Sequence, residues 1–305
     1  MKIEDLGIKN RHVLAFIPHQ DDELIGMGGT LAYACREAKS VHLVLVTDGA
    51  ADGGFLSARG IWKCSRLSGL SQYFNEEELH EHDGGLIHEE DGTWWHSSPN
   101  ELPFYEHSDP DRAPGFGCPA WGKQRDFEFL HVAQALGIKR SNIRMAYWDP
   151  SSPLHIKDGQ IAINARALSD EEMYLQYARV AQYYLRKLSP DIICTMAPYE
   201  NQTEPNDHWA CAMGVQKAAE ELDIPSVLYH HSGFLYRQIF DGGDSIGERI
   251  VLPKHSWNTK LDAMQYYFRW NPAQGWFATA AHSVPQTFKA ILEGNIQAEY
   301  ISFQP

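Results

Sequence analysis

The stretch HVLAFIPHQDDELIGMGGTLAYACREAKSVHLVLVTDG, residues 12–49, decides the fold. It opens with a β-prone apolar run, HVLAFI, which Pro18 ends, and it closes with a second apolar run, VHLVLV, ahead of Asp48 and Gly49. Between the two runs, residues 28–38 carry small and apolar side chains at helical spacing. Strand, helix and strand in so short a stretch predict a βαβ unit, and such units build parallel sheets.

The same alternation of helices and strands returns in the second half of the chain. Helices are expected at 122–136, from the capping box Ser169–Glu172 to Leu188, and at 208–222, 257–269 and 284–293. Strands are expected at 143–149, 191–198 and 226–230. The pattern predicts an α/β fold with a Rossmann-like, mostly parallel sheet flanked by helices, and residues 1–305 forming a single domain.

Residues 51–119 interrupt this alternation directly after the second predicted strand. They contain two Gly-Gly pairs, the pair Trp94–Trp95 and several histidines. Long insertions at the carboxyl ends of α/β strands often bind ligands, so we expect this one near the active site, as one wall of the substrate pocket. The alternative is a surface insertion whose aromatic side chains pack among themselves or support an oligomer contact.

Composition and charge exclude several classes of protein. A net charge of −14, from 26 Lys and Arg against 40 Asp and Glu, argues against a nucleic-acid partner. No apolar run approaches the roughly 20 residues of a membrane-spanning helix. The N-terminus MKIEDLGIKN lacks the apolar core of an export signal, and five scattered cysteines indicate reduced thiols, so a cytoplasmic location is expected. The oligomeric state is left open.

A dense cluster of titratable groups follows the first predicted strand. His19, Asp21, Asp22 and Glu23 stand within five positions, where parallel sheets bind ligands beyond the carboxyl ends of their strands. Carboxylates placed so close together repel one another unless a cation offsets their charge, so the cluster favours a divalent metal. The glycines that follow are not spaced as GxGxxG, and the carboxylates would repel a pyrophosphate, which excludes a dinucleotide cofactor.

A metal needs a third ligand besides His19 and Asp22. His208 is the best candidate, because it follows the predicted strand 191–198 and starts a helix that Asn206 or Asp207 can cap. Catalytic zinc sites use three nitrogen or oxygen ligands and an open position, and Fe²⁺ or Mn²⁺ suits the same donors.

These residues resemble a known family. The stretch AFIPHQDDELIGMGGTLA is similar to the His-Pro-Asp-Asp-Glu signature of the LmbE-like (PIG-L) deacetylases, and Asp207-His208 resembles their Asp-His pair at a helix start. The resemblance covers about 1–50 and 120–300 and leaves out the insertion. It implies a Rossmann-type fold, one divalent metal, usually zinc, and hydrolysis of the acetamide of N-acetylglucosamine units.

The resemblance also implies a role for each residue of the motifs. His19, Asp22 and His208 would be the metal ligands. Asp21 would be the general base that deprotonates the metal-bound water, whose pKa the ion lowers toward ~7. Glu23 would lie behind them and orient a ligand or the turn.

Two positions depart from the family pattern. Gln20 stands where the family usually has proline, which changes the stiffness of the backbone. Pro205 stands where many members have a histidine that stabilises the oxyanion, usually a large contribution to catalysis. The candidates to replace it are His230, His231 and His282, of which the first two end a predicted strand at the correct edge of the sheet.

The sequence therefore predicts a zinc-dependent hydrolase that removes the N-acetyl group from an N-acetylated amino sugar or its conjugate, a small-molecule substrate. A related metal-dependent amidase that cleaves another acyl amide is the first alternative. A non-catalytic sugar-binding relative is the second; Pro205 favours it, and Asp21 argues against it because binding alone needs no general base.

Overall fold

The predicted βαβ unit is present in the computed structural model. Strand β1 (His12–Ile17) leads through α1 (Asp22–Ile25) and α2 (Gly28–Glu37) to β2 (Ser40–Leu45), and the two strands pair in parallel with His12 opposite Ser40. The structure describes residues 1–47, 49, 86–88, 94–96, 119–147, 170–197, 207–231, 247–271, 276–294 and 298–303.

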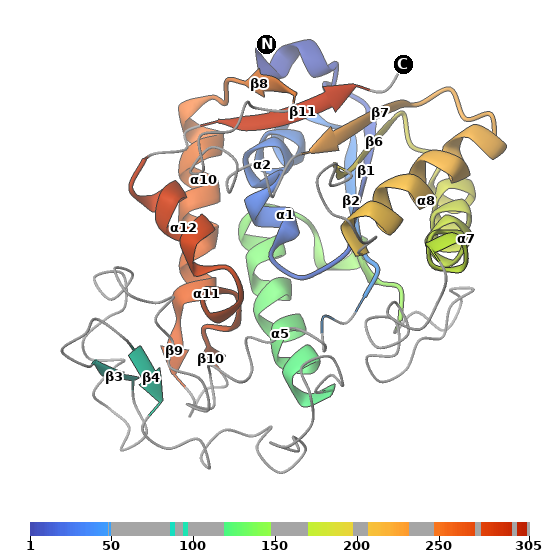
Figure 1. Cartoon of the computed structure of the whole chain (residues 1–305). Helices are drawn as coiled ribbons and strands as arrows, with labels where there is room; N and C mark the ends of the chain where they lie inside the picture. The colour runs from blue at the N-terminus through green and yellow to red at the C-terminus, as the bar shows by residue number, and fades with distance from the viewer. Residues whose placement is uncertain are drawn as a thin grey trace.

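Seven strands form the central sheet in the order β5-β2-β1-β6-β7-β11-β8 (Figure 1). The first five are parallel neighbours, which confirms the predicted Rossmann-like arrangement. Strand β11 runs antiparallel to both β7 and β8, so the sheet is mostly rather than entirely parallel. The strands not yet given bounds are β5 (Ile143–Met145), β6 (Ile192–Met196), β7 (Val227–His231), β8 (Glu248–Ile250) and β11 (Glu299–Phe303).

Helices cover both faces of the sheet (Figure 1). Alternate side chains of β1 enter different cores: Val13 and Ile17 pack with α2 and α5 (Pro119–Ala135), whereas Leu14 and Phe16 pack with α7 (Asp170–Leu188) and α8 (Asp207–Glu221). Because both faces are buried, the strands are nearly continuous apolar runs, as the sequence of residues 12–17 already shows.

The C-terminal strand anchors the segment that follows the His19 turn. Glu299 of β11 accepts the backbone N–H groups of Gly29 (2.7 Å) and Thr30 (2.9 Å) at the start of α2. The Nζ of Lys260, from α10 (Lys254–Met264), pairs with Glu299 at 2.8 Å and donates to the carbonyl of Ile25 at 3.0 Å. Both charged side chains are fully buried, and each compensates the charge of the other.

The remaining elements are short. The helix expected over 257–269 is α10 followed by a 3-10 turn, η6 (Gln265–Phe268), and the helix expected at 284–293 is α12 (Pro285–Leu292), directly after α11 (Thr279–Ser283). Besides strands β8 and β11, the elements that the sequence did not predict include η1 (Ile3–Leu6), η5 (Arg140–Asn142) and the antiparallel pair β9 (Trp270–Asn271) and β10 (Trp276–Phe277). No helix among the described residues is long and apolar enough to cross a membrane.

Within the insertion 51–119 the structure describes a small hairpin. Strand β3 (Leu86–His88) pairs antiparallel with β4 (Trp94–His96), with Ile87 opposite Trp95. The prediction that the insertion forms a wall of the pocket falls on residues outside the described ranges.

Candidate metal centre

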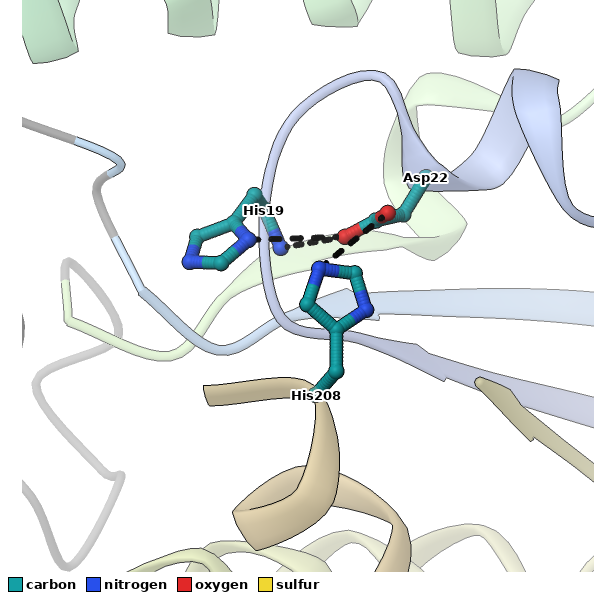
Figure 2. A group of neighbouring side chains, drawn as sticks. All are labelled: His19, Asp22 and His208. Atoms are coloured by element: carbon teal, nitrogen blue, oxygen red, sulfur yellow. Dashed lines mark hydrogen bonds and ion pairs between the residues drawn. The ribbon is translucent and has the colours of Figure 1, made fainter. Parts of the chain in front are cut away.

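His19, Asp22 and His208 converge at the carboxyl edge of the sheet (Figure 2). His19 follows β1, Asp22 is the first residue of α1, and His208 lies in the first turn of α8, the helix that follows β6. Strands β1 and β6 are parallel neighbours, so the segments that leave their carboxyl ends start from the same edge. One potential ligand atom from each side chain lies within 4.8 Å of the other two.

Asp22 lies between the two histidines. Its Oδ2 is 3.7 Å from Nδ1 of His19, and its Oδ1 is 3.7 Å from Nε2 of His208. The backbone N–H of His19 also donates to Oδ2 of Asp22, at 3.0 Å, which closes the turn. The two imidazole rings are 5.2 Å apart between centroids and tilted by 58°. Both rings therefore face one carboxylate rather than stacking on each other.

A second acid, Asp207, orients the ring of His19 through the nitrogen that does not face Asp22. Oδ2 of Asp207 is 2.9 Å from Nε2 of His19, and the hydroxyl of Tyr177, on α7, donates to Oδ1 of Asp207 at 2.8 Å. With Nε2 bonded to Asp207, Nδ1 is the nitrogen that faces Asp22. Metal-ligating histidines commonly bond a carboxylate through their other ring nitrogen in this way, which fixes the tautomer and the ring orientation.

The two histidines differ in protonation: His208 is able to ligate as it stands, whereas a cation would have to displace a proton from His19. Burial, and secondarily the charge of His19, lowers the pKa of His208 to about 4, so its ring is neutral near pH 7 and able to ligate. Burial also lowers the pKa of His19, but the bond to Asp207 and the charges of Asp207 and Asp22 outweigh it and leave that pKa raised. Burial raises the pKa of Asp207, and its bonds to His19 and Tyr177 outweigh that effect, so the pKa is lowered and the group is a carboxylate.

The donor set fits a divalent metal. Two imidazole nitrogens and one carboxylate oxygen are the ligands of catalytic rather than structural sites, because three protein ligands leave coordination positions for water and substrate. Asp22 and His208 are buried, whereas the side chain of His19 is 23% exposed, which gives the cluster one side that reaches solvent.

Asp21, the predicted general base, lies next to the cluster but outside it. Its carboxylate oxygen Oδ2 accepts a hydrogen bond from Nη2 of Arg125, on α5, at 3.0 Å, and the side chains of both residues are buried. Asp21 has φ of 102°, a left-handed conformation that is strained for a residue with a side chain. The guanidinium compensates the negative charge of this buried carboxylate.

Glu23 supports the turn, in the place where the sequence predicted an orienting residue. Its Oε1 accepts from the hydroxyl of Tyr267 at 2.6 Å, and its Oε2 accepts the backbone N–H of Asp21 at 3.0 Å. Burial, together with the negative charge of Asp21, raises the pKa of Glu23 to about 8. Glu23 thus holds the turn against η6 and is not one of the three converging side chains.

His230 and His231 lie at the end of β7 and point to opposite faces of the sheet, as consecutive strand residues do. His230 pairs with Thr195, whose hydroxyl is 3.6 Å from the Sγ of Cys211 on α8. His231 pairs with Met196, whose side chain lies against Gly26 beside α1. The third candidate, His282, lies on α11.

Both strand histidines are completely buried, and burial lowers the pKa of each to about 4. Among the described residues, neither ring is part of the three-residue cluster, and the backbone of Gly26 and the charge of Glu299 act on the ring of His231. Only His230 faces the layer of α8, the helix that carries His208.

Sequence reasoning missed two supporting residues. Tyr177 belongs to the apolar stripe of its helix, and its only signal is that a buried tyrosine hydroxyl needs a partner. Asp126 carries no motif at all; it accepts a hydrogen bond from Gln20 at 2.7 Å. Both contacts depend on how α7 and α5 dock, which residue spacing does not reveal.

Comparisons with known proteins identify the family and the fold of the chain. The family model PIG-L, GlcNAc-PI de-N-acetylase, matches residues 14–219. No curated protein matches the chain. Among solved structures, the chain is similar to the A40926 pseudoaglycone deacetylase, with 12% identity over 97% of each chain and a TM-score of 0.54. It is also similar to a deacetylase of teicoplanin biosynthesis, with 13% identity, coverage of 95% of this chain and 96% of that one, and a TM-score of 0.51. At these identities the likeness establishes the fold.

Proposed function

The chain belongs to the PIG-L (LmbE-like) family of deacetylases, and from that premise we propose that it is a metal-dependent hydrolase of N-acetylated amino sugars or their conjugates. The observation that carries the proposal is the convergence of His19, Asp22 and His208 beside the buried pair Asp21–Arg125. A deacetylase needs both parts, because an amide is cleaved by an activated water and the leaving amine needs a proton.

Three side chains would hold the ion: His19 through Nδ1, His208 through Nε2, and Asp22 through a carboxylate oxygen. Zn²⁺ is the ion that we propose, with Fe²⁺ or Mn²⁺ suited to the same donors. When bound, such an ion polarises the amide carbonyl and makes water more acidic. Asp207 keeps Nε2 of His19 engaged, so that Nδ1 stays turned toward Asp22.

Asp21 would move the proton. As a carboxylate it accepts a proton from the attacking water and returns it to the amide nitrogen as the carbon–nitrogen bond breaks. Arg125 holds one oxygen of Asp21 and stabilises its charged form, which keeps the base ready. A protein that only bound sugar would have no need of this arrangement.

We propose His230 rather than His231 for the oxyanion role that Pro205 leaves without its usual histidine. His230 faces α8, the helix of His208, next to Thr195 and Cys211. Burial raises the pKa of the Cys211 thiol to about 12, and the charges of Asp22 and Asp207 add to the rise, which supports a position of this layer beside the cluster. A neutral imidazole can donate its N–H to a developing oxyanion.

Acetate release from a panel of N-acetylated amino sugars and their conjugates tests the function. The protein is dialysed against a chelator and reloaded with Zn²⁺, Fe²⁺ or Mn²⁺ separately. Acetate release that requires metal supports the proposal. Hydrolysis of longer acyl amides without acetate release would instead show a related amidase, and sugar binding without hydrolysis of any amide would show a binding protein.

A further inference from the structure

We propose that Asp126 is a positioning residue that acts through Gln20 on the turn carrying Asp21 and Asp22. The proposal rests on the proposed function, because it concerns the same general base and the same ligand. The carrying observation is a buried hydrogen bond, 2.7 Å long, from Nε2 of Gln20 to Oδ1 of Asp126 on α5.

The turn needs to be held from outside. Asp21 has φ of 102° and ψ of −29°, and a residue with a side chain keeps such a conformation only when its surroundings determine it. The turn also places two chemically different carboxylates side by side, with Asp22 in the cluster and Asp21 outside it. A small rotation of the backbone at residue 20 would move both.

Two consecutive residues of α5, Arg125 and Asp126, form hydrogen bonds with the backbone and the side chain of Gln20. Nη2 of Arg125 donates to the backbone carbonyl of Gln20 at 2.6 Å, and Nη1 donates to the carbonyl of Gly49, at the end of the β2 segment, at 3.1 Å. Asp126 accepts the side-chain amide of Gln20. The hydroxyl of Tyr147, just after β5, donates to the same oxygen of Asp126.

Burial makes these bonds effective. Gln20 is fully buried, and Arg125, Asp126 and Tyr147 are each at most 7% exposed, so water does not compete well for their polar groups. Hydrogen bonds inside a protein are stronger than those made in water. The Gln20 side chain therefore ties the turn to α5 and, through Tyr147, to the edge strand β5.

The bond also accounts for a residue that looks out of place. A proline at position 20 would restrict φ covalently, whereas glutamine leaves the backbone there less constrained. In this chain a side-chain hydrogen bond to α5 supplies the restraint instead. A proline at position 20 should therefore be able to replace the Gln20–Asp126 hydrogen bond. Recovery of activity by that proline would indicate a positioning role of Asp126 rather than a purely structural one.

The test uses four variants of the full chain: Asp126→Ala, Asp126→Asn, Gln20→Pro, and the double variant Gln20→Pro/Asp126→Ala. Each is loaded with Zn²⁺, and kcat and KM for acetate release, the dissociation constant of Zn²⁺ by chelator competition, and the melting temperature are measured. We expect Asp126→Ala to lower kcat by about 10- to 100-fold, since small misplacements of catalytic groups have effects of that size. KM should change much less.

The conservative and rescue variants decide the interpretation. Asp126→Asn keeps an acceptor oxygen for both Gln20 and Tyr147 and should stay within about 3-fold of wild-type kcat, since its amide oxygen can take the place of Oδ1. The double variant should recover most of the kcat that Asp126→Ala loses. Unchanged kcat in Asp126→Ala, or a double variant as impaired as Asp126→Ala, would overturn the proposal.

Two further measurements keep the outcome clear. If Asp126→Ala does not fold, Gln20→Met removes the same bond from the other side and should lower kcat alike, while Tyr147→Phe, which leaves the Gln20–Asp126 bond, should have a smaller effect. If the wild-type protein releases acetate from no substrate, the proposed function fails. The positioning role is then read from Zn²⁺ affinity alone, which Asp126→Ala should weaken and the double variant restore, because Asp22 shares the turn.

Discussion

The molecule places two pairs of histidines at the same edge of its sheet, and they differ in what surrounds them. His19 and His208 face Asp22, and His19 is bonded to Asp207 as well. His230 and His231 point to opposite faces of the sheet and form no ion pair with a carboxylate among the described residues; the charge of Glu299 acts on His231, but burial outweighs it.

The difference teaches what selects a ligand histidine. Both pairs lie at the carboxyl edge of the sheet, so this position alone does not distinguish metal-binding histidines from the others. The acids are the criterion: both ligand rings face Asp22, and for His19 a second carboxylate, Asp207, bonds Nε2 and leaves Nδ1 for a cation. A histidine without such an acid is held neutral by burial, which suits hydrogen-bond donation to a developing negative charge rather than metal binding.

The largest effect is expected from breaking the acid that both ligand histidines share. Asp22→Asn replaces the carboxylate by a neutral amide, so the bound ion should fall from about one per chain to a small fraction, and hydrolysis should disappear with it. Elemental analysis after dialysis measures the ion. Asp262→Asn, an exposed aspartate on α10, is the matched control and should keep the ion. Full metal content in Asp22→Asn would remove Asp22 from the ligand set.

The neighbouring carboxylate should behave differently. Asp21→Asn keeps the three converging side chains but cannot accept a proton, so kcat should fall by about 10²- to 10⁴-fold while metal content stays at the wild-type level. Steady-state acetate release and elemental analysis of one preparation give both numbers. Equal loss of metal in Asp21→Asn and Asp22→Asn would mean that both aspartates ligate.

His231, on the opposite face of β7, is the control for the proposed oxyanion role of His230. His230→Phe should lower kcat by about 10²-fold, the effect of removing one donor to an oxyanion, and leave the ion bound. His231→Phe, on the opposite face, should leave kcat near wild type. If the two variants have the same kcat, His230 does not stabilise the oxyanion, and both histidines serve only to fill the buried interior.

A smaller effect on metal binding is expected from removing the hydroxyl of Tyr177, which donates a hydrogen bond to Asp207. Tyr177→Phe removes a hydrogen bond to Asp207, so Zn²⁺ should bind about 10-fold more weakly, which is the smallest effect expected for a group that orients a metal ligand. Chelator competition measures the affinity. A dissociation constant equal to that of the wild type would show that the bond to His19 alone suffices to fix Asp207.

The smallest effect concerns stability rather than chemistry. Burial holds the pKa of His231 at about 4, below the ordinary 6.5, so the folded chain binds fewer protons there than the unfolded chain. The contribution of this group to the free energy of unfolding is complete above pH 6.5 and is lost as the pH falls toward 4. His231→Phe should therefore lose less stability than the wild type between about pH 7 and pH 5, by urea unfolding in chelator. If the free energies of unfolding of His231→Phe and wild type change equally with pH, the pKa of His231 is not lowered in the folded chain.

Much of this fold is readable in the sequence. Strands β1 and β6 are continuous apolar runs buried on both faces, and α8 was expected to start where His208 stands. The convergence of His19, Asp22 and His208 followed from strand ends alone, because parallel neighbours place their carboxyl ends together. Strands β8 and β11 were missed, since ERI and EYISF are short and carry charged or polar side chains at an antiparallel edge.

What could not be predicted depends on docking between distant helices. Asp126 meets Gln20 only because α5 packs against the turn after β1, and Tyr177 meets Asp207 only because α7 packs along α8. A hydrogen bond between residues so far apart in the chain leaves no periodic signal. The motif therefore reveals the side chains that perform chemistry, and the structure reveals those that hold them in place.

The most direct test of the account is a crystal of the zinc-loaded protein examined by anomalous diffraction at the zinc edge. The account predicts one ion bound by His19, Asp22 and His208 at about 2.0–2.2 Å, with His230 and His231 not among its ligands. An ion bound elsewhere, or one whose ligands include a histidine of β7 and exclude His208, would contradict it.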